Sequence, residues 1–334
     1  MNSVRAEFKD VLVQARSLVE DLLSESENVI FQVASNAPSG ISERLETLFK
    51  RKGKRIRSTL LCLLASCGNE KPATNRVANA CASIELLHLA SLVHDDIIDG
   101  TELRRGMKTA HLEWGTQIAV LIGDYVLSQA MRCVINEENR NIPVILSDAA
   151  DKLIAGEITE LDYSGDMHLS REKYDKIIDG KTAALVDAAA RIGAILAGFE
   201  QDTVEKCAKM GTHFGIAFQI IDDLLDYGVG SKNLDKAKFT DLSNGLITLP
   251  LLYYFEDCNV QEHNLMEQLI AKAAEEGVPE KILEKLNEKK SFEKAKATAE
   301  EHLSQALDIA DSLPSNQFKE EMMALFASMS ERGN

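Results

Sequence analysis

Apolar residues recur every three or four positions along almost the whole chain, which is the period of an amphipathic α-helix. The first segment shows this pattern at Phe8, Leu12, Ala15, Leu18, Val19 and Leu22. Aromatic residues make up only 5% of the chain, which has six prolines, so the alternating, turn-rich pattern of a sheet protein is missing. The sequence therefore predicts an all-α fold.

Short polar breaks divide the chain into about a dozen expected helices of roughly 10 to 30 residues. These breaks fall at residues 35–40, 67–75, 139–143, 163–170, 227–245 and 275–280. The sequence has no repeat of solenoid length and no low-complexity linker, so we expect a single domain over residues 1–334. Its last part, about residues 260–334, is rich in Glu and Lys around a thin apolar stripe, which predicts peripheral, solvated helices.

The net charge of −16 argues against nucleic acid as a partner, because a phosphate backbone binds basic surfaces. The first 20 residues mix acidic with basic side chains and lack the apolar run of a signal peptide. We expect no transmembrane segment, since no stretch approaches 18 uncharged apolar residues. Six cysteines without a CxxC pair are typical of free thiols in a reducing compartment. The chain is therefore expected to be cytoplasmic.

Two acidic clusters stand inside the most apolar helices, in "LVHDDIIDGTELRRG" (92–106) and "QIIDDLLDY" (219–227). Asp95 and Asp99 are four residues apart, as are Asp222 and Asp226, and this spacing stacks two carboxylates on one helix face. Paired acids are usually solvated surface, but an unpaired carboxylate in such an apolar helix costs several kcal/mol. Oxygen ligands favour Mg²⁺, whose sites are often completed by substrate phosphates. We therefore expect two facing acidic helices around a metal and a diphosphate.

Basic residues form two further groups. The segment "KRKGKRIRS" (50–58) leads directly into an apolar helix, so Lys54, Arg55 and Arg57 would lie at a helix start, where backbone amides also favour anions. Arg104 and Arg105 follow the first acidic cluster. The two groups provide enough phosphate-binding side chains for two diphosphates.

The segment "DGKTAALV" (179–186) resembles the tail of a P-loop but does not complete that motif. The first glycine of a P-loop would fall at Asp175, and no strand is expected before it. Lys181 and Thr182 are therefore interpreted as a further phosphate contact from a helix.

Together these segments resemble the trans-isoprenyl diphosphate synthases of the polyprenyl synthetase type. The matching segments, in the order of that family, are "KGKRIRS", "HDDIIDGTELRRG", "GDYVLSQA", "GEITEL", "KTAALV", "GIAFQIIDDLLDY" and "DLSNGLITLPLL", and they cover about residues 52–252. The resemblance implies a large all-α bundle of the isoprenoid synthase type around a central cavity, usually in a homodimer. It also implies a transferase that uses Mg²⁺ for head-to-tail condensation of isopentenyl diphosphate with an allylic diphosphate.

The resemblance also assigns roles to individual positions. Three Mg²⁺ ions with bound diphosphate are expected on Asp95, Asp99 and Asp222, with Asp96, Asp223 and Asp226 in supporting places. The allylic diphosphate is expected to contact Arg104, Lys181, Thr182 and either Lys236 or Lys238. Isopentenyl diphosphate is expected on Lys54, Arg57, His88 and Arg105, and Gln219 stands where the family helps to orient the allyl group.

Product length is predicted from the helix before the first acids. Ala90 and Ser91 lie about one turn before Asp95, where short-product members of the family usually carry bulky aromatics. These small side chains predict a deep tunnel and a product longer than C20. Leu87 or Ile84, deeper on the same face, is the candidate floor of that tunnel.

The chain departs from the family pattern at Lys52, Ser58, Glu160, Phe239 and Leu246. Four alternatives to a long-chain synthase are open: a short-chain farnesyl or geranylgeranyl diphosphate synthase, a class I terpene cyclase, an HD-type phosphohydrolase using His94 and Asp95, and a non-catalytic subunit of a heteromeric synthase. The cyclase pattern of a second metal site with Ser or Thr and Glu at wider spacing is missing. Two intact acidic clusters argue against the subunit.

Overall fold

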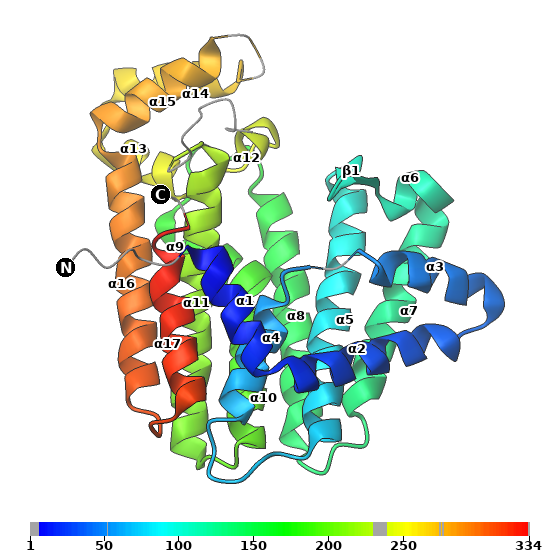
Figure 1. Cartoon of the computed structure of the whole chain (residues 1–334). Coiled ribbons are helices and arrows are strands. Elements are labelled where there is room, and N and C mark those ends of the chain that lie inside the picture. Colours follow the sequence, from blue (N-terminus) through cyan, green and yellow to red (C-terminus); the bar gives the residue numbers. More distant parts are fainter. Residues whose placement is uncertain (1–6, 52, 230–238, 274, 276, 333–334) are drawn as a thin grey trace.

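The computed structural model describes residues 7–51, 53–229, 239–273, 275 and 277–332, which form a helical bundle with one short hairpin (Figure 1). The predicted all-α fold is confirmed. The hairpin pairs β1 (Leu103–Arg104) with β2 (Met107–Lys108), and a π-helical turn, η1 (Asp179–Ala183), joins α9 to α10. The α-helices are α1 (Phe8–Leu18), α2 (Glu20–Ser35), α3 (Ser39–Phe49), α4 (Ile56–Ala65), α5 (Thr74–Ile98), α6 (Ala110–Trp114), α7 (Thr116–Val134), α8 (Asn141–Asp162), α9 (Arg171–Ile178), α10 (Ala184–Leu196), α11 (Gln201–Asp226), α12 (Thr240–Ser243), α13 (Leu249–Asp257), α14 (Val260–Ile270), α15 (Val278–Glu288), α16 (Ser291–Asp311) and α17 (Gln317–Met329).

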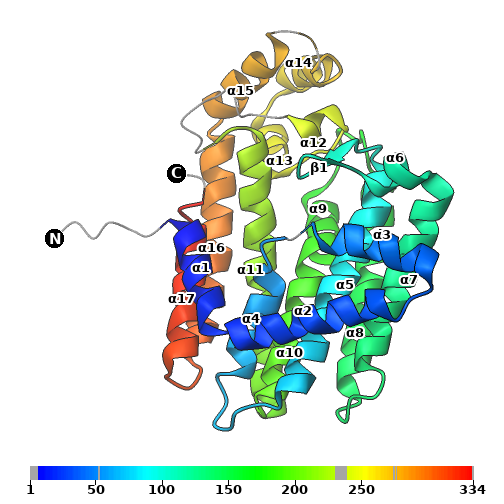
Figure 2. The same cartoon turned by 45° about the vertical axis from the view of Figure 1, so that its right-hand side comes forward.

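Long helices run side by side through the bundle, and shorter helices cover one end of it (Figures 1 and 2). The helices α5, α7, α8, α10, α11 and α16 lie roughly along one direction, whereas α2 and α3 cross them. The β1–β2 hairpin, α12, α14 and α15 gather at one end, and α5 and α11 both finish there. The fold thus places the two acidic clusters at the same end of the molecule.

Glycines allow the central helices to approach closely. A Cβ on Gly193 of α10 would lie 2.8 Å from the carbonyl oxygen of Leu61 in α4. A Cβ on Gly211 of α11 would lie 2.7 Å from the carbonyl oxygen of Val186 in α10. These approaches are closer than a methyl group tolerates, so only glycine fits. They hold α10 between α4, which follows the basic segment, and α11, which carries the second acidic cluster.

The helix α5 is long and apolar enough to cross a membrane when only length and composition are considered. Of its most apolar 18-residue stretch, 61% is buried inside the bundle, and it packs against α2, α4, α7 and α10. Core helices of soluble proteins pass the same test. In this structure α5 is the central helix that carries the first acidic cluster to the end of the bundle.

The C-terminal part is buried more deeply than its charge-rich sequence predicts. The helix α16 packs along α11, and its Ala295, Ala299 and Ala306 are at most 1% exposed. The helix α17 contributes Met322 and Phe326, both 0% exposed. These two helices are therefore part of the core and not the solvated, peripheral helices expected over residues 260–334. In α16 the buried face consists largely of alanines, which form no conspicuous apolar stripe in the sequence.

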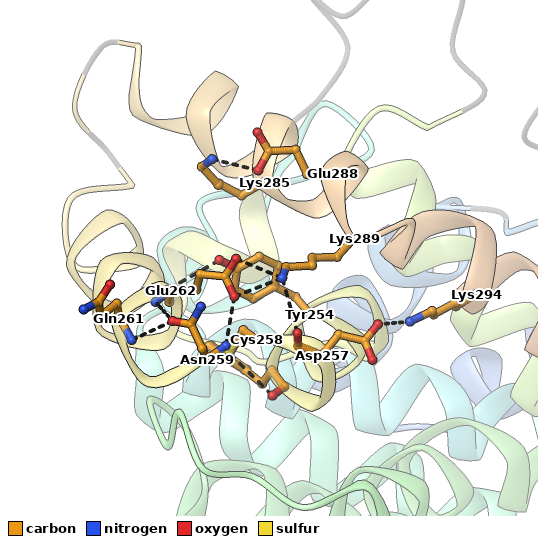
Figure 3. Close-up of polar contacts among 11 residues, drawn as sticks. Tyr254, Asp257, Cys258, Asn259, Gln261, Glu262, Lys285, Glu288, Lys289 and Lys294 are labelled. Atoms are coloured by element: carbon orange, nitrogen blue, oxygen red, sulfur yellow. Dashed lines mark hydrogen bonds and ion pairs between the residues drawn. The ribbon is translucent and has the colours of Figure 1, made fainter.

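A polar network ties α14 and α15 to the bundle (Figure 3). Asn259 and Glu262 form a reciprocal capping box at the start of α14. Lys289 donates to Glu262 at 2.9 Å and to the carbonyl oxygen of Asp257 at 3.3 Å. Lys294 of α16 pairs with the carboxylate of Asp257. These contacts hold together the connection between α13 and α14 and the connection between α15 and α16.

Candidate active site

The ends of α5 and α11 line a cavity of about 610 Å³, which we name the acidic cavity. Its charged lining residues are Asp99, Arg104, Arg105, Glu160, Lys181, Asp222, Asp223, Asp226 and Asp241. Carboxylates outnumber cations by six to three in this lining, and they come from both acidic clusters. The structure therefore brings the two predicted clusters to one site.

A second cavity of about 950 Å³ adjoins the first, and we name it the basic cavity. Its charged or titratable lining residues are Glu7, Lys9, Arg16, Arg51, Lys54, Arg55, Arg57, Glu85, His88, Arg104, Arg105, Glu331 and Arg332. Arg104 and Arg105 line both cavities. The four residues expected to hold isopentenyl diphosphate, Lys54, Arg57, His88 and Arg105, all lie in the basic cavity.

Burial and neighbouring carboxylates raise the pKa of two aspartates, Asp241 in the lining of the acidic cavity and Asp95, which that lining does not include. Burial, and then the negative charge of Glu157, raises the pKa of Asp95 to about 7. Burial, and then the charge of Asp226, raises the pKa of Asp241 to about 7. The positive charge of Lys181 lowers the pKa of both carboxyl groups. Because ionisation of buried like charges is costly, the site favours positive charge beyond that of Lys181.

The π-helical turn η1 places Lys181 over the acidic cavity. Its Nζ lies 3.0 Å from a carboxylate oxygen of Glu157 and also pairs with Glu160, both on α8. The two elements touch closely, since a Cβ on Gly180 would lie 2.7 Å from the carbonyl oxygen of Lys152. Burial lowers the pKa of Lys181, but the two glutamates more than compensate and raise it overall. Lys181 is therefore a permanent cation on a helical turn, not part of a P-loop.

Gln219 is held in one orientation by hydrogen bonds to both ends of its amide. The Thr182 hydroxyl donates to Gln219 Oε1 at 2.6 Å, and Gln219 Nε2 donates to Asp223 Oδ1 at 2.7 Å. The Tyr174 hydroxyl donates to the other oxygen of Asp223 at 3.1 Å. Asp223 is thus occupied with positioning Gln219, while Asp222 beside it is about half exposed to the cavity.

The "LRRGM" hairpin carries Arg104 and Arg105, and Arg104 contacts the first acidic cluster. Arg104 pairs across the hairpin with Met107, and the two turn residues, Arg105 and Gly106, have φ of 55° and 77°. Two positive φ values are the signature of a type I′ turn, where glycine is favoured at the second position. Arg104 donates to the buried Asp96 at 2.7 Å. Asp96 therefore contacts Arg104, which lines the acidic cavity.

At the start of α4, two arginines that line the basic cavity differ in their partners. Arg55 precedes α4 with φ of 57° and lies 2.8 Å from Glu85, whose carboxylate also accepts from Ser58 at 2.8 Å. Arg57 Nε is buried and has no hydrogen-bond partner within the described part of the chain. Such an orphaned donor favours an anionic ligand.

Positive neighbours act on two further groups of the basic cavity. Burial lowers the pKa of Lys54, and the positive charges of Arg332 and Arg105 lower it further. Burial, then Arg57 and Arg105, hold the pKa of His88 well below its usual value, so His88 is neutral. A diphosphate would relieve the repulsion among these cations.

The sequence did not indicate Arg332, which follows α17, lines the basic cavity and pairs with Asp222 of the acidic cavity. Its Nη2 lies 2.8 Å from Asp222 Oδ1, and its guanidinium carbon lies 4.5 Å from the ring centroid of Phe218. No motif marks this arginine in a charge-rich segment. Glu157 was also missed, although its place one turn before Glu160 in "GEITEL" could have revealed it.

A sequence model described as polyprenyl synthetase matches residues 38–286, which is more than half of the chain. The chain belongs to the polyprenyl synthetase family. The matched range includes both acidic clusters and both basic groups of this polyprenyl synthetase, and the predicted membership is confirmed.

Individual relatives agree with this membership. The chain is 33% identical to octaprenyl diphosphate synthase of Haemophilus influenzae over 307 residues, covering 91% of this chain and 92% of that protein. Its structure resembles decaprenyl diphosphate synthase from Rhodobacter capsulatus with a TM-score of 0.91 at 26% identity, covering 97% of this chain and 99% of the other. A polyprenyl synthase from Caulobacter crescentus, complexed with calcium and isoprenyl diphosphate, gives 0.86 at 28% identity, covering 97% and 98%. The expected isoprenoid synthase fold is confirmed.

The donors of the acidic cavity fit the divalent metal that polyprenyl synthetases use. They are oxygen donors, and their crowding favours added positive charge. Within the residues that the structure describes, no three His, Cys, Asp or Glu side chains gather closely enough to hold a metal by themselves. This arrangement suits an ion whose coordination is completed by water and a substrate diphosphate.

The HD dipeptide of this synthetase does not form a histidine metal site. His94 Nε2 lies 3.3 Å from the carbonyl oxygen of Val120 and 3.5 Å from Asp124, both on α7. The ring packs where a Cβ on Gly123 would collide with it at 2.2 Å. His94 therefore packs on α7, which argues against an HD-type phosphohydrolase.

Residues expected to set product length lie below the acidic cavity on α5. Ala90 and Leu87 are buried at 2% and 3% exposure, whereas Ser91 is half-buried and donates to the carbonyl oxygen of His88 at 2.9 Å. Neither the acidic nor the basic cavity includes these three residues in its lining. Lys236 and Lys238 lie outside the described residues.

Proposed function

We propose that this polyprenyl synthetase condenses isopentenyl diphosphate with an allylic diphosphate, head to tail, and releases diphosphate. The proposal rests on two adjoining cavities of opposite charge that share Arg104 and Arg105. The acidic cavity offers carboxylates for a metal-bound diphosphate, and the basic cavity offers cationic donors for a second one. Two neighbouring diphosphate sites are what a reaction between two prenyl diphosphates requires.

We assign Mg²⁺ to Asp99 and Asp222 of the acidic cavity and to Asp95, one turn before Asp99 on α5, with Asp226 in support and three ions as the expected number. Bound Mg²⁺ supplies electrostatic neutralisation of the leaving diphosphate. Lys181 adds a permanent positive charge directed at the same group.

The chain positions the two substrates and needs no nucleophile of its own. The carbon–oxygen bond of the allylic diphosphate breaks, and its electron pair leaves with the diphosphate. The double bond of isopentenyl diphosphate supplies the electrons of the new carbon–carbon bond, and the released diphosphate accepts the proton that the product loses. Gln219, fixed by Thr182 and Asp223, presents its amide at the reacting allyl group, while Lys54 and Arg57 hold the second diphosphate.

We propose a product longer than C20. Similarity to relatives named octaprenyl and decaprenyl diphosphate synthases supports this length. The small Ala90 and Ser91 support it independently, because neither would block a chain that grows along α5.

Turnover by the purified chain tests this function. The chain is incubated with Mg²⁺, labelled isopentenyl diphosphate and farnesyl diphosphate, and products are extracted into butanol, dephosphorylated and sized by reversed-phase chromatography. We expect polyprenyl products beyond C20 without any added polypeptide. Farnesyl or geranylgeranyl diphosphate as sole end product at excess isopentenyl diphosphate would contradict the length. A cyclic hydrocarbon would indicate a cyclase, and activity only with an added polypeptide would indicate a subunit.

We also propose that the synthetase is a cytoplasmic, single-domain protein that forms a homodimer through α7 and α8. One hydrophobic core joins residues from Phe8 to Met329, which supports a single domain.

The helices α7 and α8 carry large apolar side chains that are at least 37% exposed: Ile118, Val120, Leu121, Val144, Ile154, Ile158 and Leu161. Exposed apolar side chains gathered on two helices are typical of a subunit interface.

Leu121→Glu is expected to convert the dimer into a monomer, because a buried, unpaired carboxylate in an apolar interface costs several kcal/mol. The monomer should remain folded, since Leu121 is 62% exposed in the single chain. Mass by multi-angle light scattering checks the change, and Val260→Glu, at a residue 77% exposed on α14, is the matched control. A monomeric unsubstituted chain, or an L121E variant that stays dimeric, would refute this interface.

A further inference from the structure

Arg55 has a left-handed backbone conformation between two cationic residues of the basic cavity. Its φ is 57°, a value that residues with a Cβ rarely adopt. Arg55 precedes α4, so the chain turns there between Lys54 and Arg57, and both of these neighbours line the basic cavity. We name residues 54–57 the Arg55 turn. A strained backbone persists only where the surrounding contacts enforce it, and such positions cluster at ligand sites.

Three side chains hold the Arg55 turn in place. Arg55 Nη1 lies 2.8 Å from one carboxylate oxygen of Glu85 on α5, and the other oxygen of Glu85 accepts from the Ser58 hydroxyl at 2.8 Å. The Thr59 hydroxyl donates to the carbonyl oxygen of Arg55 at 2.6 Å. Ser58 and Thr59 are at most 1% exposed, so water does not compete for these contacts. The strained residue is therefore tied both to α5 and to the start of α4.

The two arginines of this turn differ in what they can still bind. Arg57 Nε is buried and has no hydrogen-bond partner in the described part of the chain. Arg55 is occupied by Glu85, and its Nη2 lies 4.0 Å from Glu27 on α2. Because their charges are opposite, Arg55 and Glu85 together add no net charge to the basic cavity. Arg55 Nε also lacks a partner among the described residues, so a direct contact between Arg55 and a diphosphate is the alternative to be tested.

We propose that Arg55 and Glu85 are positioning residues, whose ion pair holds the left-handed turn that directs Lys54 and Arg57 into one site for isopentenyl diphosphate. This inference rests on the function proposed above. Arg55 itself makes no contact with the diphosphate. Ser58, which ties Glu85 to α4, is one of the positions at which this chain departs from the family pattern.

Replacing Arg55 by glycine or by alanine, each together with Glu85→Gln, tests the turn. The double variants R55G/E85Q and R55A/E85Q both remove the two charges of the ion pair, so the net charge of the basic cavity stays the same. They differ by one methyl group, but glycine adopts a positive φ readily and alanine does not. Calorimetry on the full chain measures the dissociation constant of isopentenyl diphosphate. Turnover with farnesyl diphosphate and Mg²⁺ gives kcat and both KM values.

We expect R55G/E85Q to bind isopentenyl diphosphate within about threefold of the unsubstituted chain, and R55A/E85Q to bind it about tenfold more weakly or worse. In turnover, the loss in R55A/E85Q should appear in the KM for isopentenyl diphosphate, with kcat changed less than about threefold. The KM for farnesyl diphosphate should stay the same, because neither Arg55 nor Glu85 lines the acidic cavity.

Lys290 offers a matched control for the change of backbone preference. It precedes α16 with φ of 54°, is exposed and lines neither cavity. The variants K290G and K290A are therefore expected to bind isopentenyl diphosphate equally, and as tightly as the unsubstituted chain. Thermal unfolding of every variant shows that folded chains are compared.

Equal loss of binding in both double variants would mean that Arg55 contacts the diphosphate, and equal retention would mean that the turn does not matter. Either result overturns the inference. If R55A/E85Q does not fold, R55G/E85Q decides alone, since tenfold weaker binding by that folded variant contradicts a positioning role. A comparable difference between K290G and K290A would also overturn the inference, because the effect would then follow general stability. An unsubstituted chain that neither binds isopentenyl diphosphate nor turns it over would instead overturn the proposed function.

Discussion

Asp95→Asn is expected to lower kcat about a thousandfold or more while raising the thermal stability of the metal-free protein. The carboxylate is half-buried close to Glu157 and Asp99, and burial, then the negative charge of Glu157, raises its pKa to about 7. The amide keeps the shape of the side chain, removes the repulsion and cannot serve as a charged ligand. Turnover with Mg²⁺, farnesyl diphosphate and isopentenyl diphosphate gives the first effect, and calorimetric unfolding in a chelator gives the second.

The stability gain should depend on pH in a defined direction. The folded pKa of Asp95 lies above that of the unfolded chain, so the folded state binds the proton more tightly. The stability contributed by this carboxyl group is complete below about pH 4 and is lost as pH rises through about 7. The unfolding temperature of D95N should therefore exceed that of the unsubstituted chain by roughly 2–4 °C at pH 8 and differ little at pH 5.

Asp308→Asn is the matched control, because Asp308 is exposed on α16 and lines neither cavity. It is expected to leave both kcat and the unfolding temperature unchanged. Normal turnover of D95N, or an unfolding temperature at pH 8 below that of the unsubstituted chain, would refute the role given to Asp95.

Local patterns were enough to predict the helices and the meeting of the two acidic clusters. Apolar spacing reports which face of a helix is buried, and Asp95 and Asp222 stood in helices too apolar for unpaired acids. The matching motifs then fixed the order in which the elements surround one cavity. These signals are short-range or family-wide, so they can be read without coordinates.

Other parts of the site depend on tertiary contacts that leave little trace in the sequence. Arg332 meets Asp222 across 110 positions of the chain, and nothing local distinguishes it from other C-terminal cations. Asp96 and Asp223 belong to the same acidic runs as Asp95 and Asp222, yet they hold Arg104 and Gln219. Which member of an acidic run is paired with another side chain is set by helix rotation, which is a property of packing.

Burial of the C-terminal helices escaped prediction for a related reason. The apolar stripe of α16 is built largely from Ala295, Ala299 and Ala306, which a pattern search for large apolar residues passes over. These small side chains permit α16 to pack closely against α11, the helix that carries the second acidic cluster.

Ser91→Phe is expected to shorten the main product from beyond C20 to about C15 or C20. Ser91 lies four residues before Asp95, about 6 Å along α5 on the same face, so a ring there would stop a chain growing from the acidic cavity. The half-buried Ser91 has more room for a ring than Ala90, at 2% exposure, where overpacking would cost about 1–3 kcal/mol. Reversed-phase chromatography of dephosphorylated products measures the shift.

Ser91→Ala separates the volume of the side chain from its hydrogen bond. Alanine removes the bond from Ser91 Oγ to the carbonyl oxygen of His88 without adding bulk, so the product should keep its length. A five-carbon allylic primer places no chain as deep as Ser91, so S91F should retain its rate of adding one isopentenyl unit to such a primer. If S91F still makes the full-length product, the growing chain does not pass along this face of α5. In that case Leu87 is not the floor of the product tunnel, since it lies one turn deeper on the same face.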